Sequence, residues 1–86
     1  MNIQEMADML RNNRDELSVD EVIELCFIVM EQHKDVTEQC YAAVILSGLV
    51  KPGLGDRVLE FLEDNPQLPA RARQLLSANI MRMETF

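Results

Sequence analysis

Two helix-start signals lie within the stretch SVDEVIELCFIVMEQHKDVTEQCYAAVILSGL, residues 18–49. Ser18 followed by Glu21 matches a capping box, in which each side chain accepts a hydrogen bond from the backbone N–H of the other residue. Asp35 followed by Glu38 repeats the spacing. The pattern therefore predicts one helix over about residues 19–33 and a second over about residues 36–49.

The first of these helices has apolar residues on two sides. Its core-facing stripe follows the helical period and comprises Val22, Ile23, Cys26 and Met30. Its polar stripe comprises Asp20, Glu24 and Glu31. Phe27 and Ile28 fall between the members of the polar stripe and interrupt it. Either this helix is central and buried on most sides, or its second apolar side meets a partner.

Residues 40–46 of the second helix, Cys-Tyr-Ala-Ala-Val-Ile-Leu, contain no charged side chain. A helix that is apolar on all sides over nearly two turns is expected to be buried. A buried strand is the competing interpretation of such a run. The preceding cap and the small residues Ala42 and Ala43, which allow close helix–helix approach, favour the helix.

The remaining chain supplies further helices on either side. Apolar residues at helical spacing predict a helix over about residues 2–12, a second over about 55–64 and a third from Pro69 to about Met83. The run from Gly48 to Gly55 contains three glycines and Pro52, which predicts a turn. We therefore predict an all-α fold: one domain over residues 1–86, with four or five short antiparallel helices arranged as helical hairpins.

Charge excludes two classes of partner. The chain carries 15 acidic and eight basic residues, a net charge of −7. Nucleic acids and anionic membranes both require clustered Lys and Arg, so neither is an expected partner. No apolar run is long enough to span a bilayer. The N-terminus also lacks the basic and apolar regions of a secretory signal.

Catalytic and metal-binding residues are scarce. His33 is the only histidine, and no triad, paired-carboxylate site or Ca²⁺-loop pattern accompanies it. Cys26, His33 and Cys40 are spaced by seven, but a predicted helix break separates them and zinc would lack a fourth ligand. We expect no catalytic residue, metal or cofactor. The two cysteines are expected to be reduced and buried, with a single disulfide as the alternative.

The segment CYAAVILSGLVKPGLGDRVLEFLEDNPQLPARARQLL, residues 40–76, resembles the small acidic co-chaperones that guard the needle subunit in bacterial type III secretion systems. The shared features are an Ala/Leu-rich helix ending in Leu-Ser-Gly-Leu, a turn, an amphipathic helix and a Pro-containing break. Val36–Phe61 also has about the size of one tetratricopeptide helix-turn-helix unit. The resemblance implies a cytoplasmic protein with a tetratricopeptide-like groove. That groove would hold the amphipathic C-terminal helix of the needle subunit, usually alongside a second small chaperone.

The predicted groove residues are Phe27, Ile28, Tyr41, Ile45 and Leu49. Two alternatives stay open. One is a small acidic inhibitor of phage or regulatory type that docks on a larger enzyme through Asp20, Glu24 and Glu31, so that its binding weakens with salt. The other is a helical homodimer whose faces complete a common core.

Overall fold

Five α-helices and one turn of 3₁₀ helix make up the part of the chain that the computed structural model describes, residues 1–84. In chain order the elements are α1 (Ile3–Asn12), η1 (Arg14–Glu16), α2 (Val19–Gln32), α3 (Val36–Ser47), α4 (Leu54–Asp64) and α5 (Ala70–Met83). No β-strand occurs among these residues. The predicted all-α fold is therefore confirmed, and each helix begins and ends within two residues of its expected bounds.

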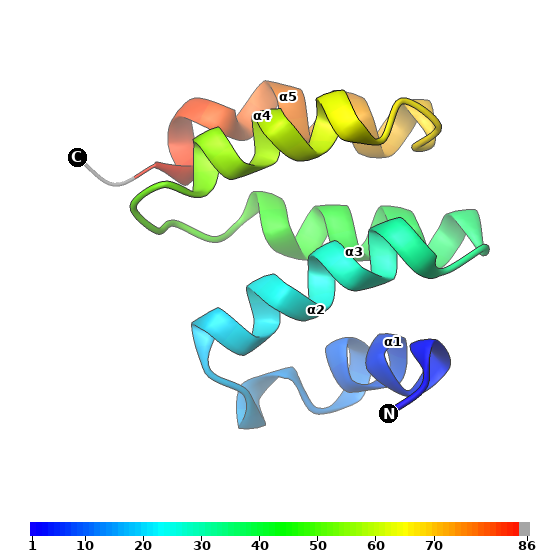
Figure 1. Cartoon of the computed structure of the whole chain (residues 1–86). Helices are drawn as coiled ribbons and strands as arrows, with labels where there is room; N and C mark the ends of the chain where they lie inside the picture. The colour runs from blue at the N-terminus through cyan, green and yellow to red at the C-terminus, as the bar shows by residue number, and fades with distance from the viewer. Residues whose placement is uncertain (85–86) are drawn as a thin grey trace.

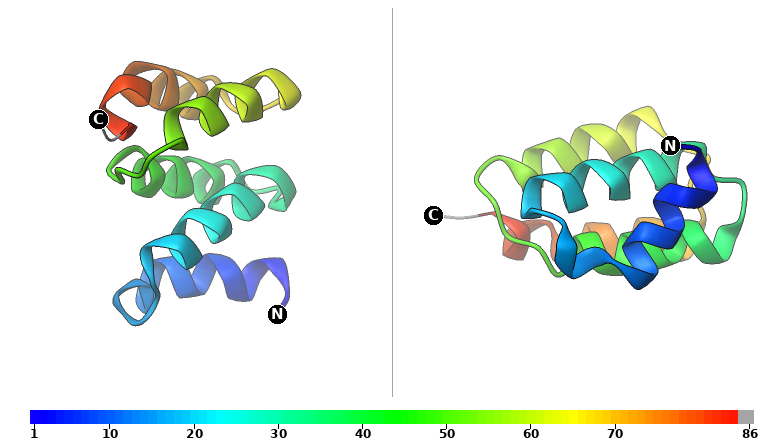
Figure 2. Two further views of the ribbon diagram at one scale, coloured as in Figure 1. Left: turned by 60° about the vertical axis from the view of Figure 1, so that its left-hand side comes forward. Right: turned by 90° about the horizontal axis from the view of Figure 1, so that it is seen from below.

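The hairpins α2–α3 and α4–α5 stack on one another, and α1 closes the α2–α3 end of the stack (Figure 1). Each hairpin contributes one helix to each of two layers, the α2/α4 layer and the α3/α5 layer. Seen from below, α2 and α4 lie on one side of the molecule and α3 and α5 on the other (Figure 2). The result is a slab with extents of 32 × 28 × 16 Å, thin enough that most helices keep one side toward solvent.

Capping fixes where the helices begin. The predicted box at α2 is present, since the Ser18 hydroxyl accepts from the Glu21 N–H at 3.1 Å and the Glu21 carboxylate accepts from the Ser18 N–H at 2.9 Å. Asp35 caps α3 by accepting from the Thr37 N–H at 2.8 Å. Glu38 does not complete a second box as its spacing predicts, because its carboxylate pairs with Arg11 of α1 instead.

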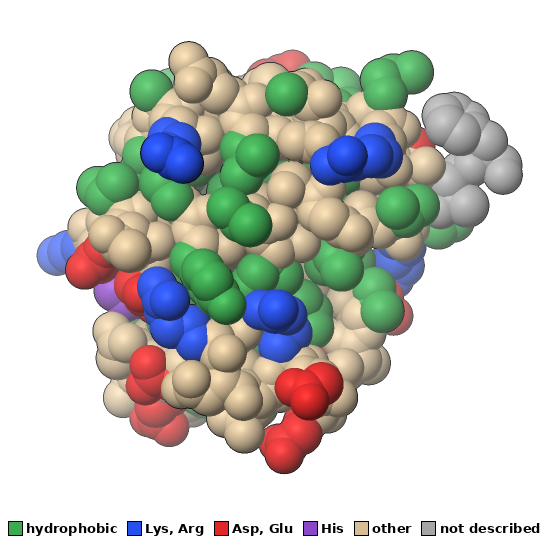
Figure 3. Space-filling view, turned by 180° about the vertical axis from the view of Figure 1, so that it is seen from behind, with side chains coloured by type: hydrophobic (Ala, Val, Ile, Leu, Met, Phe, Trp, Pro, Cys, Tyr) green, Lys and Arg blue, Asp and Glu red, His purple; other side chains and the backbone are tan. Residues whose placement is uncertain are grey.

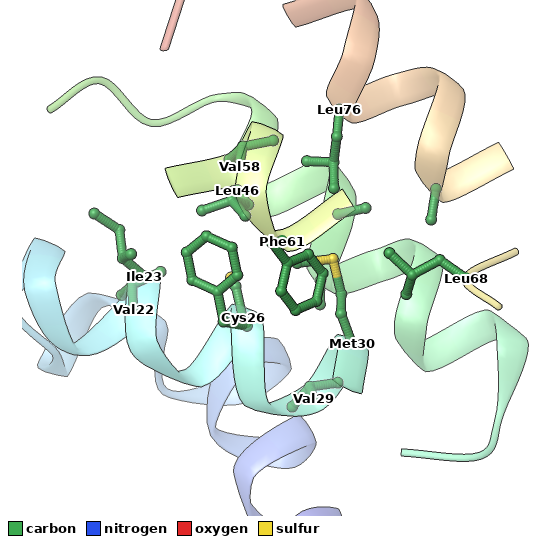
Figure 4. Close-up of a cluster of buried hydrophobic side chains, with 14 of the residues drawn as sticks. Val22, Ile23, Cys26, Val29, Met30, Leu46, Val58, Phe61, Leu68 and Leu76 are labelled. Atoms are coloured by element: carbon green, nitrogen blue, oxygen red, sulfur yellow. The ribbon is translucent and has the colours of Figure 1, made fainter. Parts of the chain in front are cut away.

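The core lies between the two layers and consists mainly of aliphatic side chains around the rings of Phe27 and Phe61 (Figure 4). Ala42 and Ala43 of α3 are completely buried, as their small size predicts for a helix packed closely on its neighbours. Cys26 is also fully buried, and this burial raises the pKa of its thiol to about 12. Neither cysteine forms a disulfide in this structure. The expectation that both are buried holds for Cys26 alone, because Cys40 is only half-buried.

The end of α5 caps the start of α4. Gly53 has φ = 84°, the left-handed conformation that glycine adopts without steric cost, but it offers no side chain to cap α4. The Glu84 carboxylate supplies the missing acceptor, taking hydrogen bonds from the Asp56 N–H at 3.0 Å and the Gly53 N–H at 2.9 Å. These two hydrogen bonds lower the pKa of Glu84. The stabilisation is therefore present above the unfolded-state pKa and is lost as the pH falls through the lowered folded-state value.

Replacement of Gly55 by alanine should destabilise the fold. Alanine normally stabilises a helix interior relative to glycine. Here, however, a Cβ at residue 55 would lie 2.6 Å from Glu84 Cγ and 3.0 Å from the Ile80 carbonyl oxygen, so the carboxylate would be pushed off the helix. We expect a loss of about 1–3 kcal/mol, the usual cost of overpacking. Gly48→Ala is the control, because its Cβ would meet only the Ile45 carbonyl oxygen at 3.6 Å. A melting temperature of Gly55→Ala equal to or above that of the wild type would contradict the close packing of Gly55 against Glu84 and Ile80.

Candidate functional site

The five predicted groove residues do not form one surface. Phe27 and Ile28 belong to α2, whereas Tyr41 and Ile45 belong to α3 and Leu49 follows its end. These helices lie in different layers, so the two groups of side chains belong to two faces of the slab (Figure 2).

Phe27 is part of the core. Its side chain is only 6% exposed, and its ring packs edge-on against Phe61 of α4 with ring centroids 4.9 Å apart. The Arg57 guanidinium lies over the ring, 4.3 Å from its centroid. Of the two possibilities that the sequence left open for this side of α2, Phe27 therefore follows burial, because α4 covers it. Ile28 stays half-buried and lines a hollow between α2 and α4.

Charge is divided unequally between the two layers. Helices α2 and α4 contain eight carboxylates and one arginine, a net charge of −7. Helices α3 and α5 contain one carboxylate and three arginines, a net charge of +2. The net charge of the α2/α4 layer thus equals that of the whole chain.

Two of the three carboxylates in the polar stripe of α2 form ion pairs within the chain. Glu24 accepts two hydrogen bonds from Arg57, one of them 2.9 Å long, and this contact lowers the pKa of Glu24. Asp20 pairs with Lys51 at the turn before α4. Both ion pairs tie α2 to the α4 region. Of the three stripe carboxylates, only Glu31 forms no ion pair within residues 1–84.

Beyond Glu38 in the first turn, the outward side of α3 carries no charged residue. Tyr41, Val44, Ile45 and Gly48 recur at the i, i+3, i+4, i+7 spacing of one helical face. Val44 is 54% exposed, whereas Ala42, Ala43 and Leu46 on the other side of the helix are buried. The expectation that residues 40–46 are buried on all sides is therefore wrong. The solvent-facing side of a helix is ordinarily polar, which makes this side of α3 a candidate binding surface.

Leu75 of α5 extends this surface. A shallow hollow of about 340 Å³ between α3 and α5 is lined by Val44, Arg71, Gln74 and Leu75. We call Tyr41, Val44, Ile45 and Leu75 the apolar stripe. The space-filling view of this side of the molecule has hydrophobic side chains gathered across its middle, with Lys and Arg side chains above and below them (Figure 3). Ile45 and Leu75 are half-buried and pack against the core, so Val44 is the most exposed aliphatic member of the stripe. Leu49 is also half-buried but lies beyond the end of α3.

Arginines flank the apolar stripe on two sides. On the α1 side, the Arg11 guanidinium lies over the Tyr41 ring at 4.2 Å from its centroid, and Arg14 donates to the Tyr41 hydroxyl at 3.3 Å. On the α5 side lies Arg71. Arg11 is paired with Glu38, but neither Arg14 nor Arg71 forms an ion pair within residues 1–84. The stripe is thus an apolar surface between positive charges, on a chain that is acidic as a whole.

His33 has a structural place at the end of α2. Its Nδ1 accepts from the Asp35 N–H at 3.0 Å, and its Nε2 lies 2.9 Å from the Gln4 side-chain oxygen of α1. The ring thus joins α1 to the α2–α3 turn. Within residues 1–84, no group of three or more His, Cys, Asp or Glu side chains is placed to hold a metal ion. No helix in the same range is both long and apolar enough to cross a membrane.

Comparison with known proteins finds no match to a family model, to a curated protein or to a solved structure. The function must therefore be inferred from the residues of the two faces.

Proposed function

We propose that the chain is a non-enzymatic adaptor of the chaperone kind, which covers an amphipathic helix of a partner protein with its apolar stripe. The observation that carries the proposal is the outward side of α3 from Tyr41 to Gly48, which has no charged residue and on which Val44 is 54% exposed. An exposed apolar surface with a rim of polar residues is typical of a protein-binding site. A helix laid into such a surface buries its own apolar side without requiring any catalytic group.

The arginines define the chemistry of the partner helix. Arg11 and Arg14 lie on one side of the stripe and Arg71 on the other. A helix with an apolar side and glutamates or aspartates along both edges would therefore match the surface in both polarity and charge. The tyrosine at the α1 side adds an amphipathic aromatic contact, a residue type enriched where interfaces bind most tightly.

The resemblance to type III secretion co-chaperones supplies the most specific version of this proposal. In that version the partner is a needle subunit, which must keep its polymerising C-terminal helix covered in the cytoplasm until export. A second small chaperone would complete the complex. The surface that we propose for the helix differs from the first expectation. It adds Val44 and Leu75, and it omits Phe27, Ile28 and Leu49.

The proposal is tested with a synthetic helical peptide of about 18 residues, roughly five helical turns. The peptide has leucines at i, i+3, i+4 and i+7 and glutamates on both flanks. Calorimetric titration should give an affinity at least about tenfold higher than that of a scrambled peptide of the same composition, since scrambling removes the apolar side. Equal affinities would overturn the proposal.

Isolation from the native host tests the partner itself. A discrete complex with a small helical protein supports the chaperone. Sedimentation across concentration that gives only a stable homodimer would favour the dimer instead. Co-purification with a large enzyme that is lost in high salt would favour the inhibitor.

A further inference from the structure

We propose that the groove between α2 and α4 is a second docking site, which takes a basic polypeptide segment that presents arginine side chains. This site lies in the layer opposite the apolar stripe (Figure 2), so the inference stands independently of the proposed function. With both sites occupied, the chain would hold two different polypeptides on opposite faces.

The groove consists of two hollows that share residues. One, of about 330 Å³, is lined by residues of both helices: Glu24, Phe27, Ile28, Glu31, Arg57, Glu60, Phe61 and Asp64. The other, of about 370 Å³, runs toward the turn before α4 and also includes Glu24 and Arg57. The ion pair between Glu24 and Arg57 lies where they meet. Apolar residues thus lie beneath a rim of carboxylates.

The contacts of Arg57 show how a guanidinium can bind in this groove. Its guanidinium lies over the Phe27 ring, 4.3 Å from the centroid, while Glu24 accepts its hydrogen bonds. An aromatic face together with a carboxylate is a favourable environment for a guanidinium, which stacks and forms paired hydrogen bonds at once. The chain's own arginine therefore occupies one end of the first hollow in the way that we propose for a partner's arginine.

The other end of the first hollow is also lined by an aromatic side chain and carboxylates, but no basic residue within residues 1–84 pairs with those carboxylates. Phe61 contributes the aromatic side chain, and Glu31, Glu60 and Asp64 contribute three carboxylates. None of the three forms an ion pair within residues 1–84. A partner's guanidinium would complete this end as Arg57 completes the other.

Charge selects a basic polypeptide over other occupants. The α2/α4 layer has a net charge of −7, which attracts a cationic segment and repels nucleic acid. Within residues 1–84 no cluster here is placed to hold a metal ion. The apolar floor favours side chains that combine a charged head with an apolar stem, as arginine does.

The test uses a synthetic helical peptide with arginines one turn apart in an alanine background, titrated at low salt. The triple variant Glu31→Gln, Glu60→Gln, Asp64→Asn should bind it about tenfold or more weakly than the wild type, because it loses the rim charges. The control, Asp15→Asn, Glu16→Gln, Glu63→Gln, removes as many carboxylates outside the groove. It should weaken binding less than about threefold, through long-range charge alone. Equal losses in the two variants would overturn the groove as the site.

Arg57→Ala supplies a second, opposite readout. Removing the internal guanidinium exposes Phe27 and Glu24 to the peptide, so affinity should rise about threefold or more. Arg82→Ala, which removes one positive charge outside the groove, should raise it less than about twofold. No difference between these variants would also overturn the proposal. Sedimentation of the free chain tests whether a second copy of this chain fills the groove. Self-association that is abolished in the triple variant Glu31→Gln, Glu60→Gln, Asp64→Asn would assign the groove to that second copy and overturn the proposal.

Discussion

Phe27→Ala should lower the free energy of unfolding by about 3–5 kcal/mol, the range found when a buried phenylalanine is truncated. Phe27 is only 6% exposed, so truncation removes its contacts with the core and with the Phe61 ring. It also removes the aromatic face on which the Arg57 guanidinium lies, and so weakens the connection between α2 and α4. Chemical denaturation monitored by circular dichroism measures the loss.

Ile28→Ala is the matched comparison, since it truncates the neighbouring residue of the same helix. Ile28 is half-buried beside the groove, so its truncation should cost less than about 1.5 kcal/mol. If the two substitutions cost the same, Phe27 is not a core residue and the α2–α4 packing is incorrect.

The contrast between these neighbours marks what the sequence could predict. Periodicity placed both residues outside the main core stripe of α2, which includes Val22, Ile23 and Cys26. Ile28 is half-buried, but Phe27 belongs to the core. Periodicity could not indicate that Phe61, 34 positions later, would cover Phe27, because that contact depends on how the two hairpins stack. Both possibilities, burial and a free surface, were consistent with the sequence, and Phe27 follows the first.

Val44 is the opposite case. An uninterrupted apolar run predicts burial, but burial requires a neighbour on every side of the helix. Helix α3 packs on α2 and α5, while the α3/α5 side of the slab remains uncovered (Figure 2). The absence of charge between Glu38 and Lys51 was visible in the sequence. Its meaning, an exposed apolar side, could be recognised only once the layers were known.

Features that depend on residues close in the sequence were predicted more accurately than contacts between distant residues. The box between Ser18 and Glu21 fixes the start of α2 within four residues of chain, so its spacing alone identifies it. The hydrogen bond by which Glu84 caps α4 joins residues 31 positions apart, and no spacing of residues in the sequence predicts it. Glu38 likewise has a cap spacing but pairs with Arg11, 27 positions earlier.

Val44→Asp should abolish most binding of the amphipathic, glutamate-flanked peptide, with a loss of affinity of about 30-fold or more. The substitution places a charge where the peptide's apolar side must lie, and an unpaired charge is costly to bury. The new carboxylate also repels the acidic flanks of the peptide. Because Val44 is 54% exposed, the fold itself should be almost unaffected, with a stability change within about 1 kcal/mol.

Two companion variants separate the contributions. Leu59→Asp introduces the same charge at a residue that is 46% exposed on α4, in the other layer, and should weaken binding less than about threefold. Val44→Lys removes the same apolar contact but attracts the peptide's glutamates, so it should lose less affinity than Val44→Asp. If Leu59→Asp and Val44→Asp weaken binding equally, the effect arises from net charge and the apolar stripe is not the binding surface. If Val44→Lys and Val44→Asp are equally impaired, the stripe binds through apolar contact alone, and Arg11, Arg14 and Arg71 do not select the partner's charge.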